Sequence, residues 1–173
     1  MQSEEYRQLR TYTRYDGLYL AILWSASFAC TVMSSLGTIV GAIGNLLALA
    51  SPFFVGYWVK RYRDDALGGR ISFRRALLFC FEVFFDGAFI FAICQFLYMK
   101  FLDNGKLLHV YQTMMSMPEM KPVIQAYGVS EAELNQAMQQ MFDPFALASY
   151  SFIVACICGA VLSFIIAAIM KKQ

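Results

Sequence analysis

The sequence has little charge for its length of 173 residues. Asp, Glu, Lys and Arg together make up 15% of it, against about a quarter of an ordinary soluble domain. Hydrophobic residues make up 59%, and 16 residues are Phe. A soluble domain of this size cannot bury so much apolar surface, and a disordered chain has the opposite composition. The composition therefore predicts an integral membrane protein and excludes a nucleic-acid-binding tail.

Cysteine is missing from the polar segments, and histidine occurs once, as His109. All five cysteines lie in apolar runs, which is typical of free thiols and not of disulfides between exposed loops. The sequence contains no Gly-x-Ser-x-Gly, His-Glu-x-x-His or Cys-x-x-Cys motif. We therefore expect no enzyme, no cofactor and no metal site.

Four apolar stretches have the length of about 20 residues that a helix needs to cross a bilayer core of about 30 Å. We predict an all-α, polytopic bundle of four transmembrane helices that forms a single membrane domain over residues 1–173. Asp143 is suited to capping the last helix, with Pro144 at its first position. The predicted spans are about 18–36, 41–59, 76–99 and 145–170.

The distribution of cations predicts the orientation. Eleven of the 14 Lys and Arg residues lie in the N-terminal segment, in the link between the second and third spans, or at the C-terminal tail. With four spans these three regions share one face of the membrane, and the positive-inside rule places that face in the cytoplasm. We therefore expect a multi-pass protein of the bacterial inner membrane with both termini in the cytoplasm.

The third link, about residues 102–143, then faces the outside. Ser130 and Glu133 form a capping-box pattern, and apolar residues follow it at helical spacing. We expect a short amphipathic helix here, on the membrane surface or on the bundle, and an earlier helix from about 106 to 117. The methionines near His109 are typical of an adaptable apolar surface, although thioethers also bind Cu(I).

Glu82 and Asp86 lie one helical turn apart in the third span, and Asn45 is a polar residue of the second. Counted from Ala76, Asp86 lies near the membrane midplane, where a charged carboxylate costs roughly 2.5–3.5 kcal/mol. No Lys or Arg lies deep in a predicted span, so we expect no basic partner within the chain. The acids are then a proton or cation site, protonated groups that bond neighbouring helices, or partners of a basic residue in another subunit.

Two further sets of residues are candidates for contacts. Small residues recur every four positions in the second span, where they favour close helix packing, and a proline among them predicts a kink. The basic link is either an anchor that sets the topology or a docking site for a lipid headgroup or a protein partner. The packing set is Gly44, Ala48, Pro52 and Gly56, and the docking set is Arg61, Arg63, Arg70, Arg74 and Arg75.

The link residues Arg61-Tyr62-Arg63-Asp64 and Gly68-Gly69-Arg70-Ile71-Ser72-Phe73, together with Tyr127-Gly128-Val129-Ser130-Glu131, resemble a known family. It is the Bacteroidota membrane protein family of unknown function catalogued as domain-of-unknown-function family 4199. The resemblance covers nearly the whole chain and implies the inner membrane of a Gram-negative cell. It also implies an association with membrane-linked glycosyltransferases.

These observations lead to two hypotheses of function. The first is a non-catalytic accessory subunit of a membrane enzyme, such as a glycosyltransferase that handles a polyprenyl-phosphate or another lipid-linked sugar. Its partners are membrane lipids and either that enzyme or further copies of the chain. The alternative is a small proton-coupled transporter or carrier that uses Glu82 and Asp86.

Overall fold

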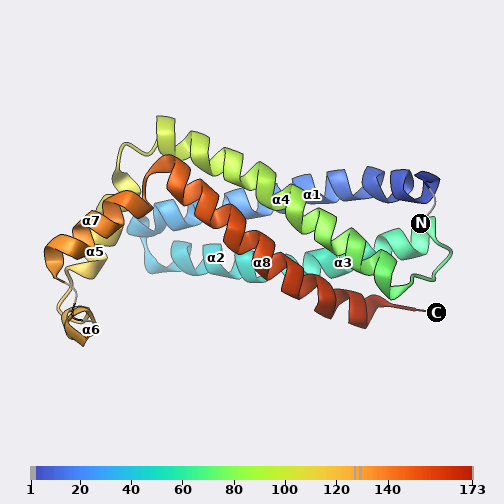
Figure 1. The fold of residues 1–173 in the computed structure, drawn as a ribbon. Coiled ribbons are helices and arrows are strands. Elements are labelled where there is room, and N and C mark those ends of the chain that lie inside the picture. Colours follow the sequence, from blue (N-terminus) through green and yellow to red (C-terminus); the bar gives the residue numbers. More distant parts are fainter. Residues whose placement is uncertain (1–2, 127, 129, 173) are drawn as a thin grey trace. The chain divides into compact units, whose positions relative to one another are not determined.

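The computed structural model describes residues 3–126, 128 and 130–172. Within these ranges the regular secondary structure is helical, apart from one isolated antiparallel bridge between Ile71 and Lys172 (Figure 1). The predicted all-α class is therefore confirmed. The elements are α1 (Ser3–Val32), a 3-10 turn (Met33–Leu36), α2 (Thr38–Leu49), α3 (Ser51–Ala66), α4 (Phe73–Phe101), α5 (Lys106–Met115), α6 (Lys121–Ala126), α7 (Glu131–Met141) and α8 (Pro144–Met170).

The chain separates into two compact units. Unit 1 comprises Met1–Ala92 and Ser151–Gln173, and unit 2 comprises Ile93–Tyr150. Unit 1 contains the three helices from α1 to α3, most of α4 and most of α8. Unit 2 contains α5, α6 and α7 with the adjoining ends of α4 and α8.

Three helical segments of the described chain are long and apolar enough to cross a membrane: Ile39–Ala66, Phe73–Phe101 and Pro144–Met170. They contain three of the four predicted spans. The remaining prediction, 18–36, is divided between α1, which ends at Val32, and the 3-10 turn; α1 is 30 residues long but is not among the three segments. Its apolar run is diluted by polar side chains, including Asp16, Ser25 and Ser27.

The segment Ile39–Ala66 is interrupted at Ala50, where α2 ends and α3 begins. Pro52 has no N–H group, so it cannot bond the carbonyl of Ala48 as a helical residue would. The Ser51 hydroxyl donates to that carbonyl instead, at 2.6 Å. The helix is thus interrupted beside Pro52, where the sequence predicts a kink, and a neighbouring side chain bonds the carbonyl that the proline leaves free.

The buried core of unit 1 is formed by side chains from α1, α3, α4 and α8. At its centre Tyr62 is fully buried, with its ring stacked on Phe79 at 4.9 Å between centroids and tilted against Tyr12 at 5.1 Å. Arg75 donates to the Tyr62 hydroxyl at 2.8 Å. The largest fully buried side chain of this core therefore has a polar partner.

Both described chain ends lie beside the link between α3 and α4 (Figure 1). Near the N-terminus, Glu5 lies 3.6 Å from Arg75 at the beginning of α4. Near the C-terminus, Lys172 and Ile71 exchange two backbone hydrogen bonds of 2.9 and 3.0 Å. In unit 1, α1 therefore begins at the same end at which α8 finishes.

Unit 2 contains the predicted helices of the third link. The capping box at Ser130 and Glu133 is confirmed, and α5 matches the earlier predicted helix. Asp103 accepts from the backbone N–H of Leu107 in the first turn of α5, and α6 is a further helix that was not predicted from the sequence. In the motif at 127–131 used for the family resemblance, positions 127 and 129 lie outside the described residues.

Candidate functional site

A cluster of charged side chains joins α1 to α4 within unit 1. The guanidinium of Arg10 donates to Glu82 and to Asp86, both at 3.0 Å. The Thr13 hydroxyl donates to Glu82 at 3.2 Å, and the Tyr6 hydroxyl does so at 2.8 Å. One arginine thus bonds two carboxylates on consecutive turns of α4, and α1 supplies two further hydrogen bonds.

The expectation that the acids have no basic partner within the chain is wrong. It considered only the cations within the predicted spans, whereas α1 begins at Ser3, before the first of these spans, and Arg10 of this helix bonds both acids of α4. The side chains of Glu82 and Asp86 are 14% and 17% exposed, and that of Arg10 is 34% exposed. The cluster is therefore only partly shielded from its surroundings.

The position of Asp86 is set by its neighbour Gly17. A Cβ atom added to Gly17 would lie 2.7 Å from the Cβ of Asp86, so the two helices are in close contact here. Gly17 directly precedes the first predicted span. Asp86 therefore lies beside the residue that precedes this predicted span.

A second ion pair joins α1 to α3. Arg61 donates to Asp16 at 2.7 Å, and the Asp16 side chain is completely buried. Burial raises the pKa of Asp16 to about 6, although the bond to Arg61 favours the ionised form. The other carboxylate oxygen of Asp16 is buried without a hydrogen-bond partner. Sequence reasoning missed this pair, because its members are 45 positions apart.

The structure divides the five arginines of the docking set. Arg63 pairs with Asp64 at 2.8 Å, and Arg75 bonds the hydroxyl of the core residue Tyr62. Arg61 is occupied in part by Asp16. The remaining two, Arg70 and Arg74, are exposed. The cations that face outward are thus fewer than the sequence suggests.

The small residues of the packing set are divided between neighbouring helices. Gly44 is buried against α1, where Ser27 donates to its carbonyl at 2.8 Å, and Gly56 is buried against Met170 of α8. Asn45 and Ala48 are exposed on α2. The two glycines therefore pack within the chain, whereas Asn45 faces outward.

Ser51 links the break between α2 and α3 to α1. Its hydroxyl accepts from Trp24 Nε1 at 2.7 Å while it donates to Ala48. We expect Ser51→Ala to lower the free energy of unfolding by about 1–3 kcal/mol, because two partly buried polar groups lose their partner. Unfolding of the purified chain in mixed detergent micelles measures this loss. Ser25→Ala on α1 is the matched control, and an equal effect of both changes would contradict the assignment.

In the part of the chain that the structure describes, no group of three or more His, Cys, Asp or Glu side chains is arranged to hold a metal ion. The five cysteines are free thiols, as predicted. His109 is exposed on α5, with Met114 and Met117 also exposed.

The helical fold, the apolar segments and the ion pairs between helices define the class of a helical membrane protein. The chain matches the model of the family described as "Protein of unknown function (DUF4199)" over residues 15–172, and it belongs to that family. No curated protein and no solved structure matches it.

Proposed function

We propose that the chain crosses the inner membrane four times, with both termini in the cytoplasm, and acts as a non-catalytic subunit of a membrane enzyme. The enzyme class is a glycosyltransferase that uses a polyprenyl-phosphate or another lipid-linked sugar. The cytoplasmic face is the end of unit 1 that carries the α3–α4 link.

The position of the chain ends supports an even number of crossings. Glu5 and Lys172 both lie beside the link between α3 and α4. Three candidate spans alone would leave the two ends on opposite faces. A crossing by α1 restores the parity, and its 30 residues extend for about 45 Å, well beyond a bilayer core of about 30 Å.

The partner role is supported mainly by the contrast between acids that are paired within the chain and arginines that are exposed. Glu82 and Asp86 are both bound by Arg10 of the same chain, so the cation that they contact is supplied within unit 1. By contrast, Arg70 and Arg74 face outward beside the α3–α4 link. An outward-facing basic surface complements an acidic partner segment or a phosphate-bearing substrate that a partner holds.

Affinity purification of the full chain in mild detergent, followed by mass spectrometry, tests the partner role. We expect one membrane glycosyltransferase to be enriched in a fixed ratio to the chain. The variant Arg70→Glu/Arg74→Glu should release it, whereas the control Arg7→Glu/Arg14→Glu, which reverses two exposed charges of α1, should retain it. Recovery of the chain alone, or equal release by both variants, would contradict the proposal.

The transporter hypothesis makes a different prediction for the two acids. Proton-coupled transport requires Glu82 and Asp86, so Glu82→Gln/Asp86→Asn would abolish a pH-dependent flux in proteoliposomes. For a partner subunit we expect no such flux in the unmodified chain, and the same change weakens assembly through the loss of the Arg10 contacts. A flux that depends on the acids would overturn the partner role.

The orientation is tested by labelling single engineered cysteines in a chain without native cysteines. We expect a membrane-impermeant maleimide added to intact cells to label Gln136→Cys on α7, because this exposed residue belongs to the third link. The matched site Asp65→Cys at the end of α3 should be labelled only after the membrane is opened. The reverse pattern would overturn the proposed orientation.

A further inference from the structure

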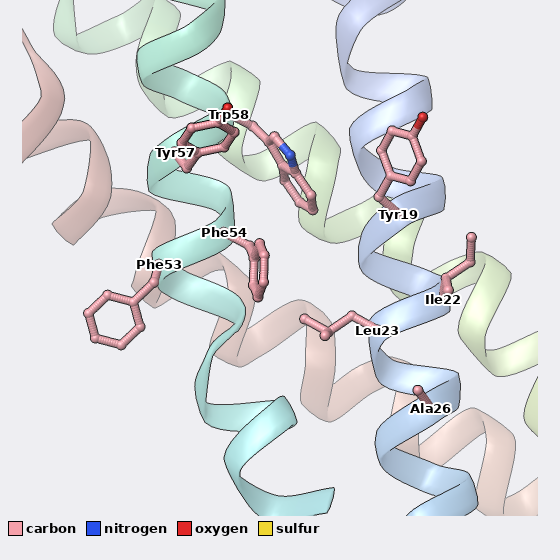
Figure 2. A pocket seen from close by; sticks show the side chains of 8 residues that line it. All are labelled: Tyr19, Ile22, Leu23, Ala26, Phe53, Phe54, Tyr57 and Trp58. Atoms are coloured by element: carbon pink, nitrogen blue, oxygen red, sulfur yellow. The ribbon is translucent and has the colours of Figure 1, made fainter. Parts of the chain in front are cut away.

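A lateral groove of about 680 Å³ lies between α1 and α3 in unit 1 (Figure 2). This volume is within the range of roughly 300–1,000 Å³ that is usual for small-molecule sites. Figure 2 shows Leu23 from α1 and Phe54 from α3 extending toward each other across it. The groove is lined by Tyr19, Ile22, Leu23, Ala26, Phe53, Phe54, Tyr57 and Trp58.

One end of the groove is marked by aromatic and charged side chains. The rings of Tyr19 and Trp58 approach to 6.4 Å between centroids. One helical turn further, the ion pair of Asp16 and Arg61 joins the same two helices. Both Asp16 and Arg61 lie three positions from a lining residue, so they continue the faces that form the groove.

Two cations at this end, Lys60 and Arg61, are positioned to bind a further anion. Arg61 contacts Asp16 through one terminal nitrogen, and its side chain is 35% exposed. Lys60 is exposed and lies three positions from Tyr57, on the same side of α3. Because Asp16 is buried, it anchors the Arg61 side chain at the end of the groove, and only one of the three guanidinium nitrogens is used in that bond.

We propose that the groove binds an anionic phospholipid, with one acyl chain along the apolar walls and the phosphate at Lys60 and Arg61. The proposal rests on the membrane placement given above, but it does not depend on the partner enzyme. Tyr and Trp are enriched where a protein meets the membrane–water interface, and here they separate the apolar walls from the cations. The apolar walls, the aromatic rings and the cations therefore follow one another in the same order as the acyl chain, the interfacial region and the phosphate of a lipid.

The combination of the two features identifies the occupant. A free phosphate would use the cations without the apolar walls, and a zwitterionic lipid would gain little from two cations. An anionic lipid uses both, because each cation near an anionic headgroup contributes about 1 kcal/mol, or about a five-fold change in affinity.

Native mass spectrometry of the full chain in detergent tests the site. Phosphatidylglycerol and phosphatidylcholine with identical acyl chains are added in equal amounts, and the number of lipids retained per chain is counted. We expect one phosphatidylglycerol to be retained at least five-fold more than phosphatidylcholine. Inorganic phosphate added as a competitor at equal concentration should not displace it.

Two pairs of variants separate the headgroup from the groove. Lys60→Gln alters an exposed residue and should lower phosphatidylglycerol retention about five-fold, whereas Arg70→Gln, in the exposed link, should not. Ala26→Trp fills the groove and should abolish retention of this lipid, whereas Ala168→Trp, at an exposed position of α8, should not. Thermal unfolding of each variant checks that the fold is kept.

The result that overturns the proposal is equal retention of the two lipids, or retention that neither Lys60→Gln nor Ala26→Trp reduces. Displacement by inorganic phosphate would also overturn it, since it would show a site for the anion alone. The partner role is measured by co-purification and is unaffected by any of these outcomes, so the two proposals fail separately.

Discussion

Replacing Arg10 by Met should lower the free energy of unfolding by about 2–4 kcal/mol. The change removes the cation that bonds both Glu82 and Asp86 at 3.0 Å and leaves two carboxylates one turn apart on α4. Breaking a fully buried ion pair from one side costs about 3–5 kcal/mol. The expected loss is smaller here because about a third of the Arg10 side chain is exposed, so solvent screens part of the interaction.

A titration with SDS in mixed detergent micelles measures this loss. The control is Arg7→Met, which removes an exposed cation one turn earlier on α1 and should change the free energy by less than about 0.5 kcal/mol. The triple variant Arg10→Met/Glu82→Gln/Asp86→Asn should recover most of the loss, because no charge remains in the contact without a partner. A loss in Arg10→Met that does not exceed the control would contradict the role assigned to the cluster.

The features that sequence reasoning located correctly have local causes. The break near Pro52 follows from one missing N–H group, and the helix starts at Ser130 and Asp143 follow from side chains that bond a backbone N–H within three residues. The three apolar segments follow from composition over about 20 residues. Each of these signals lies within a single stretch of the chain and needs no knowledge of neighbouring helices.

The ion pairs required information of another kind. Arg10 is 72 positions from Glu82, and Asp16 is 45 positions from Arg61, so both contacts depend on how the helices are aligned side by side. One signal was available, because Arg10, Thr13, Gly17 and Leu20 recur every three to four residues and predict a helix face that begins before position 18. Hydropathy alone does not identify this helix face, because a charged helical turn next to an apolar run has the same hydropathy as a solvated segment.

Introducing a large side chain at position 17 should separate α1 from α4. In Gly17→Leu the new Cβ would lie 2.7 Å from the Cβ of Asp86, 3.3 Å from the backbone nitrogen of Gly87 and 3.4 Å from the carbonyl oxygen of Val83. Two of these neighbours are backbone atoms, which cannot rotate away. Overpacking a core usually costs about 1–3 kcal/mol, and this contact should reach or exceed the upper value.

The same unfolding assay distinguishes a helix contact from a general effect of leucine. Ala29→Leu makes a small-to-large change at an exposed position of the same helix and should leave stability within about 0.5 kcal/mol of the unmodified chain. Gly17→Ala should fall between the two, because its single methyl group meets the same atoms while alanine favours the helix by about 1 kcal/mol. Equal effects of the two leucine variants would show that α1 and α4 are not in contact at this position.

Combining Gly17→Leu with Arg10→Met shows whether the charged cluster depends on the close approach of the helices. If α1 must lie against α4 for Arg10 to reach both acids, the first change already disrupts the ion pairs, and the second should add little. We therefore expect the loss in the double variant to be at least 1 kcal/mol smaller than the sum of the two single losses, a coupling of the size found for residues that share contacts. Additive losses would mean that Arg10 keeps its bonds after α1 is displaced, and that Gly17 and the ion pairs stabilise the fold independently.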